Sequence, residues 1–198
     1  MCSSDLTQAF NAGSSISSPG TFQVEGGTTT IAGTVPFAIT GTTSVTGGTL
    51  VLNGASTTNG FSQSSGEVRG PGNLTVTGAA NISYGRHSGA GTTIFQGTTS
   101  VTSSGLGLDA GRAGRNEGTF TLSNSTLDLN PTNTAGVGTF TNASGATFVA
   151  TQSSQIYANN PGGDPAVGAS FTNQGIFQKT GRSEEHTSEL QSHSDLVC

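Results

Sequence analysis

The chain has 198 residues, of which 31 are glycine, none is tryptophan and only 9% are charged, and its formal net charge is −5. A chain this poor in Lys and Arg lacks the basic stripe that phosphate backbones require, which argues against nucleic-acid binding. No apolar run approaches the roughly 20 residues that a membrane-spanning helix needs.

The two ends of the chain differ in composition from the rest. Residues 182–198 are charged and free of glycine, and their codons can be read as a common sequencing-library adapter. Residues 1–6 can be read as the reverse complement of the start of that string. We therefore expect a metagenomic fragment in which residues 1–6 and 182–198 are adapter-derived artefacts, the latter disordered or a stray helix. Both are excluded from the fold prediction.

The remaining segment, residues 7–181, is nearly neutral. It holds five basic and six acidic residues, so its formal net charge is −1. Both cysteines, Cys2 and Cys198, fall outside it, which leaves it no disulfide, thiolate metal site or cysteine nucleophile. Its single histidine, His87, lies in a turn-like sequence and cannot assemble a zinc site by itself.

Apolar residues in this segment fall in short alternating runs that glycine-rich turns separate. Each run places two apolar residues two positions apart, on one face of a strand, and threonine is expected at the outward positions. This order argues against a flexible linker, which the Gly, Ser and Thr content leaves as an alternative. In chain order the runs are Phe22–Val24, Phe37–Ile39, Leu50–Leu52, Leu74–Val76, Ile82–Tyr84, Phe120–Leu122 and Leu127–Leu129.

A glycine two positions before an apolar residue recurs along the chain. Several successive offsets fall between 20 and 28 residues, which indicates a stacked repeat, and no helix-period segment interrupts the pattern. We predict an all-β parallel β-helix, or β-solenoid, that lacks its caps, with an antiparallel β-sandwich as the alternative. The glycines are Gly20, Gly48, Gly72, Gly118, Gly138 and Gly175.

Several motifs resemble those of bacterial secreted β-strand-repeat proteins of the autotransporter-like and filamentous-haemagglutinin-like kinds. Members often carry tryptophan where Tyr84 stands here. The resemblance implies an extracellular or bacterial outer-surface β-helix that serves as a stalk, adhesin or passenger, with no catalytic residue, cofactor or metal site. The motifs that carry it are Gly66–Gly78, Ser88–Thr93, Asn116–Phe120, Phe140–Asn142 and Phe171–Gly181.

The densest charged group comprises Asp109, Arg112, Arg115 and Glu117. We expect a loop that presents a small ion-pair cluster there, either in contact with a glycan or simply solvated. Catalysis on a β-helix would need clustered carboxylates, as an acid/base pair or as calcium ligands. The carboxylates of the segment are instead scattered, at Glu25, Glu67, Asp109, Glu117, Asp128 and Asp164.

The expected function is therefore structural and adhesive, without catalysis. Surface glycans of a host or of the environment are the expected partners, and nucleic acid is not. Self-association through the uncapped ends is expected as well, because open strand edges pair readily. The alternative is a non-catalytic part of a carbohydrate-active β-helix enzyme.

Overall fold

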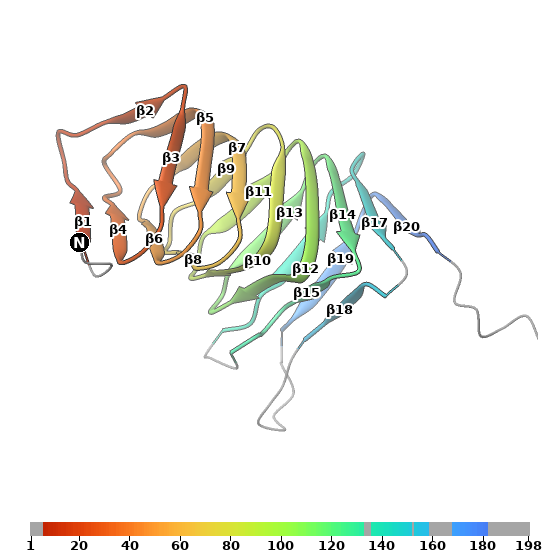
Figure 1. Ribbon diagram of the computed structural model, residues 1–198. Helices are drawn as coiled ribbons and strands as arrows, with labels where there is room; N and C mark the ends of the chain where they lie inside the picture. The colour runs from red at the N-terminus through yellow and green to blue at the C-terminus, as the bar shows by residue number, and fades with distance from the viewer. Residues whose placement is uncertain (1–5, 133–135, 152, 159–167, 182–198) are drawn as a thin grey trace, which may run out of the picture.

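In the computed structural model, the chain forms a rod of stacked β-strand turns, with the N-terminal strands at one end and β20 (Ile176–Lys179) at the other (Figure 1). The structure describes residues 6–132, 136–151, 153–158 and 168–181. These residues form 20 strands and no helix, and all pairings between strands are parallel. The predicted β-solenoid is confirmed, and the sandwich is excluded. The predictions for residues 1–5 and 182–198 lie outside the described residues.

Each turn has three sides, and equivalent sides of successive turns pair in register. Stack A contains β1 (Thr7–Phe10), β4 (Thr28–Ile31), β6 (Thr49–Leu52), β8 (Glu67–Arg69), the second halves of β10 (Ala80–Ser88) and β12 (Thr98–Asp109), β15 (Thr126–Asp128) and β18 (Gln155–Tyr157).

The other two sides are continuous in the same way. Stack B contains β2 (Ile16–Ser18), the first halves of β5 (Phe37–Val45) and β7 (Ser56–Gln63), β9 (Leu74–Val76), β11 (Thr92–Phe95), β13 (Ala113–Asn116), β16 (Thr139–Asn142) and β19 (Ser170–Asn173). Stack C contains β3 (Thr21–Val24), the second halves of β5 and β7, the first halves of β10 and β12, β14 (Thr119–Ser123), β17 (Thr147–Ala150) and β20.

The turns differ in length, and the predicted spacing is only partly right. Along stack A, Thr28 pairs with Thr49, 21 residues on, and Thr49 pairs with Glu67, 18 residues on. The recurring glycines do not mark equivalent positions, because Gly48 precedes β6 in stack A and Gly72 precedes β9 in stack B. The offsets between those glycines therefore mix different sides of the turn.

The interior of the rod is a narrow apolar core. Inward side chains alternate with outward ones along most strands, as in the intermediate-buried-intermediate-buried pattern of β6 and the exposed-buried-intermediate-buried-intermediate pattern of β14. Phe120 stacks on Phe148, with ring centroids 5.3 Å apart, and meets Phe95 and Phe140 edge-on. Each turn packs on the next through such contacts, so the core runs the length of the rod.

Threonine is not confined to the outer surface as predicted. Thr29, Thr43, Thr58, Thr93 and Thr99 are buried inside the rod. The hydroxyls of Thr43 and Thr58 lie 3.0 Å apart, and that of Thr58 donates to the carbonyl of Gly60 at 2.7 Å. A threonine can point inward where its hydroxyl finds such a partner, as at Thr43 and Thr58, whereas the buried hydroxyl of Thr99 has no hydrogen-bond partner among the described residues.

An asparagine ladder runs along the corner between stacks B and C. The side-chain amide of Asn116 donates to Oδ1 of Asn142 at 2.7 Å, and Asn142 donates in the same way to Asn173 at 2.7 Å. The same amides also donate to the carbonyls of Thr147 and Ile176. Because Asn116 and Asn142 are fully buried, these bonds hold three successive turns in one register.

A register shift in β10 overturns one detail of the strand prediction. The sequence pattern places Ile82 and Tyr84 on the same inward face. In the structure Ile82 is buried, but Tyr84 is 55% exposed, because the pairing with β12 shifts between the two residues. A bulge of this kind re-aims the side chains that follow it. As a result, Tyr84 joins the outer face, and His87, predicted in a turn, points inward from a strand.

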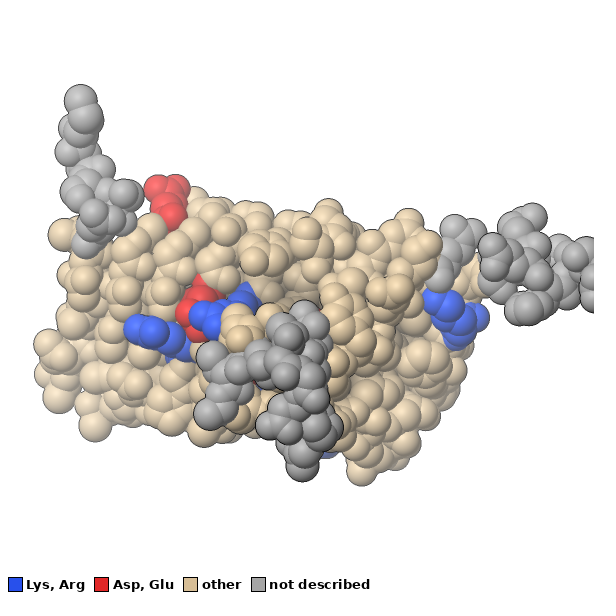
Figure 2. Space-filling model, turned by 90° about the horizontal axis from the view of Figure 1, so that it is seen from below, with Lys and Arg blue, Asp and Glu red and all other residues tan. Residues whose placement is uncertain are grey.

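The surface of the rod carries little charge. Figure 2 shows a face that is largely free of charged side chains, apart from a cluster of acidic and basic groups, a separate acidic group toward the N-terminal end and a basic group near the other end of the rod. Since surface ion pairs contribute only about 0–1 kcal/mol each, the rod is stabilised mainly by its core and by the bonds between turns.

Candidate functional site

A shallow groove of about 540 Å³ lies along the outer side of stack A. Its floor contains glycines from successive turns, among them Gly66, Gly85 and Gly105. A side chain cannot be added at Gly85 without displacing Gln63, because a Cβ there would lie 2.2 Å from Cδ of Gln63. Because Gln63 is buried, Gly85 faces the interior of the rod and leaves room for that side chain, while the groove spans several turns on the outer side.

An ion-pair chain crosses one half of the groove. Arg86 lies 2.8 Å from Glu67 of the preceding turn and 3.3 Å from Asp109 of the following turn. The hydroxyl of Ser88 donates to Glu67, and that of Thr132 donates to Asp109. The guanidinium of Arg86 is thus held in place by carboxylates on both sides, while about a third of the side chain stays exposed.

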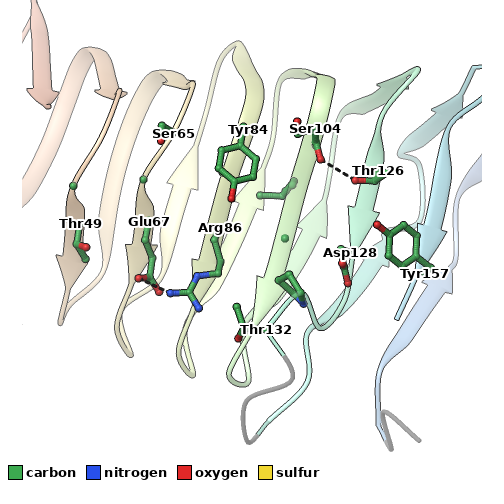
Figure 3. Close-up of a pocket in the computed structure, with 17 residues that line it drawn as sticks. Thr49, Ser65, Glu67, Tyr84, Arg86, Ser104, Thr126, Asp128, Thr132 and Tyr157 are labelled. Atoms are coloured by element: carbon green, nitrogen blue, oxygen red, sulfur yellow. Dashed lines mark hydrogen bonds and ion pairs between the residues drawn. The ribbon is translucent and has the colours of Figure 1, made fainter. Parts of the chain in front are cut away.

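The other half of the groove is flanked by aromatic rings. Tyr84 and Tyr157 stand on either side of Thr126 and Asp128 (Figure 3). The hydroxyl of Thr126 donates to the carbonyl of Ser104 at 2.9 Å. The groove therefore combines exposed rings with hydroxyl, carboxylate and guanidinium groups, which can donate and accept hydrogen bonds along an extended ligand.

Beneath the groove, Arg112 is fully buried in the rod. Its Nε and Nη2 donate to the hydroxyl of Thr93 at 3.1 and 3.0 Å, and its Nη1 donates to the carbonyls of Gly70 and Gly72 at 3.2 and 3.1 Å. Burial lowers the pKa of Arg112 to about 10, so the side chain still carries its charge at neutral pH. A planar fork of donors thus joins three turns from inside.

His87 continues this network across the interior. Its Nδ1 lies 2.9 Å from the hydroxyl of Thr93, and its Nε2 lies 2.9 Å from Oε1 of Gln63. Since Thr93 accepts from Arg112, its own proton points to Nδ1, and the neutral Nε2–H tautomer of His87 satisfies every partner. Burial, aided by the charge of Arg112, lowers the pKa of His87 to about 3.

The four predicted contact residues do not form one cluster. Asp109, at the end of β12, is buried in the pair with Arg86, and Arg112 is buried with Thr93. Arg115 of β13 and Glu117 form a separate exposed pair, 2.7 Å apart on the outer side of stack B. The turn after Asp109 directs Arg112 into the interior of the rod. Arg112 is therefore separated from Arg115 and Glu117, which lie on the outer surface.

Hydrogen bonds in this exposed pair shift the pKa of Glu117. The pKa of Glu117 is lowered by its hydrogen bond to Arg115 and by a second one from Gln96 of the preceding turn. Both side chains are about a third exposed or more, so solvent screening weakens the attraction between them. Glu117 and Arg115 line no part of the groove.

The sequence pattern did not identify the residues that build the groove. Glu67, the Tyr84–Arg86 segment of β10 and Tyr157 lie far apart in the chain, and only the stacking of turns brings them together. Asp164 lies outside the described residues. Within the described part of the chain, no group of three or more His, Cys, Asp or Glu residues could hold a metal ion. A helix able to cross a membrane is also absent from that part.

Comparison with known proteins yields no relative: no protein-family model, curated protein or solved structure matches this chain. Function is therefore inferred from the geometry of the rod and its groove.

Proposed function

We propose that this chain is a structural and adhesive repeat region of a secreted bacterial cell-surface protein, in which the solenoid acts as a rigid stalk. The observation that carries this proposal is the continuous parallel pairing of stacks A, B and C from β1 to β20. Each turn contacts only its neighbours, so the length of such a rod grows with the number of turns while its cross-section stays constant. A surface protein can use that geometry to carry a binding face away from the cell.

The alternative, part of a carbohydrate-active β-helix enzyme, has less support. Glycoside hydrolysis needs two carboxyl groups roughly 5–9.5 Å apart. The carboxylates that line the groove, Glu67 and Asp128, are three turns apart in the register, about 14 Å at 4.8 Å per strand. Glu67 is also engaged by Arg86 and Ser88. Glu67 and Asp109 lie closer together, since both contact the guanidinium of Arg86, but Asp109 is 0% exposed and also accepts from Thr132. Because the nearer carboxylates are already paired, the groove favours a binding and structural role.

Single-molecule force spectroscopy tests the stalk role directly. With the chain held by its two ends, we expect a constant length under low tension and then discrete steps as turns peel away. A turn of 21 residues, such as that from Thr28 to Thr49, releases roughly 65 Å of chain. Smooth stretching of the whole chain at low force would contradict the proposal.

A matched pair of variants in β5 and the residue after it provides the control. Val45 is fully buried, and Thr46 next to it is exposed. Val45→Asp places a charge in the core and should lower the force of the first step, whereas Thr46→Asp should leave the trace unchanged. Equal traces for the two variants would show that the core does not bear the load.

A further inference from the structure

Two exposed tyrosines mark the groove as a surface of unusual composition. The described residues include five exposed large hydrophobic side chains, and four of these, Leu6, Tyr157, Ile176 and Phe177, lie in the first and last turns. The fifth, Tyr84, is 55% exposed in the middle of the rod, and it lines the groove together with Tyr157, which is 40% exposed. Aromatic side chains left in water on one face commonly mark a binding surface.

The two rings have a fixed spacing along the rod. Tyr84 pairs with Gly105, and Tyr157 pairs with Asp128. The tyrosines are therefore three turns apart, about 14 Å along the axis at 4.8 Å per strand. Between them Gly105 has a positive φ of 93° and admits no side chain, because a Cβ there would meet the carbonyl of Thr126 at 2.1 Å, and the ring of Pro131 lies over Gly107 at the edge of this space. An extended chain can lie in this space and contact both rings.

Charge restricts the chemistry of the ligand. Arg86 is paired with both Glu67 and Asp109, so it has no net positive charge to offer an acidic polymer. Asp109 and Asp128 are buried, 0% and 8% exposed, and are poor partners for a cationic peptide. The exposed polar groups that remain suit a ligand that carries many hydroxyls and no charge.

We propose that this groove binds a neutral linear oligosaccharide. The rings of Tyr84 and Tyr157 pack on the apolar faces of two sugar units, and Glu67, Arg86 and Thr126 exchange hydrogen bonds with sugar hydroxyls. This inference rests on the proposed function, because it names the partner of the adhesive surface. Its test is separate, since binding is measured in solution and the force experiment measures the stalk alone.

Tyrosine fluorescence reports on this groove selectively. The chain contains two tyrosines and no tryptophan, and both tyrosines line the groove. The probes are neutral hexasaccharides of β-1,4-glucose, α-1,4-glucose, β-1,4-xylose and β-1,4-mannose, with a hexamer of galacturonic acid as the acidic comparison. We expect at least one neutral probe to change the fluorescence saturably below about 10 mM, a weak affinity in the range of surface glycan contacts. The acidic hexamer should bind more weakly.

Variants at the exposed rings locate the site without disturbing the core. Tyr84→Ala and Tyr157→Ala, followed by calorimetric titration, should each weaken binding about tenfold or more, the usual loss when an aromatic contact is truncated. Tyr84→Phe keeps the ring and should retain most of the affinity. Asn81→Ala, an exposed change on the stack C side of the same strand β10, is the control and should bind like the unmodified chain.

Three results would overturn the proposal. The first is no response to any of the neutral hexasaccharides. The second is tighter binding of the galacturonic acid hexamer, which would reverse the assigned ligand class. The third is unchanged binding in the Tyr84→Ala/Tyr157→Ala double variant with an unchanged circular dichroism spectrum, which would place the ligand elsewhere on the rod.

Discussion

Replacing Arg112 with alanine is expected to lower the free energy of unfolding by about 2–4 kcal/mol. The change removes every donor to the hydroxyl of Thr93 and to the carbonyl of Gly72 that Arg112 now supplies. It also leaves a cavity at a fully buried position. The alanine variant no longer has to bury the guanidinium charge, and the desolvation cost that is removed offsets part of this loss. Urea denaturation followed by circular dichroism measures the difference.

Two further variants separate the geometry of Arg112 from its charge. Arg112→Lys keeps the charge but offers one ammonium in place of a planar fork, so it should be destabilised almost as much as the alanine variant. Arg69→Ala removes an exposed arginine and should shift stability by no more than about 0.5 kcal/mol. If Arg112→Ala matched Arg69→Ala, the buried network would not stabilise the rod.

Acid is expected to destabilise the rod well before its carboxylates are protonated. Burial lowers the pKa of His87 to about 3, whereas an unfolded histidine titrates near 6.5. Between these pH values His87 is protonated in the unfolded chain and neutral in the folded chain. The free energy of unfolding therefore decreases as pH decreases from 6.5 toward 3. The loss is roughly 1.4 kcal/mol per pH unit within that window, and up to about 5 kcal/mol in total.

The interval from pH 6.5 to 5 isolates this effect, because ordinary carboxylates titrate at lower pH. The urea midpoint should fall over that interval in the unmodified chain. His87→Gln retains groups that can bond Thr93 and Gln63 but does not titrate, so its midpoint should stay nearly constant there. A midpoint that falls equally in both proteins would show that another group is responsible.

Local alternation predicted the strands well. Pairs such as Leu50 and Leu52, or Phe120 and Leu122, are buried together as the spacing requires. The pairing partners were less predictable, because similar glycines begin strands on all three sides of the turn. The 18- to 29-residue turns of stack A, from Thr49–Glu67 to Asp128–Tyr157, vary too much to set a single period.

The buried polar network could not be predicted from alternation alone. His87 and Arg112 look like surface residues in a sequence rich in Gly and Ser. Their burial depends on contacts between turns, from His87 to Gln63 of the preceding turn and from Arg112 to Thr93 of the preceding turn. The Arg115–Glu117 ion pair was predictable because its members lie two residues apart in sequence, Arg115 in β13 and Glu117 just after that strand.

The groove could not be predicted from the sequence pattern either, because its residues come from different turns. Tyr84 follows Ile82 at the spacing of a shared inward face, and only the register shift in β10 turns it outward. Tyr157 reaches the same groove through pairing with Asp128 across a 29-residue turn. No local pattern reports such a contact, since it depends on the stacking order of the turns.

The central claim, a rigid solenoid with one strand per side in each turn, is tested most directly by electron spin resonance distances along stack B. Spin labels are placed at exposed positions by Ser17→Cys with Thr172→Cys, and by Thr57→Cys with Thr172→Cys, after Cys2 and Cys198 are changed to serine. Ser17 and Thr172 are seven register steps apart, about 34 Å between Cα atoms, and Thr57 and Thr172 are five steps apart, about 24 Å.

We predict two narrow distance distributions whose centres differ by about 10 Å, a difference that does not depend on the length of the label. Broad distributions, or two centres at the same distance, would contradict the solenoid rod and the stalk function built on it.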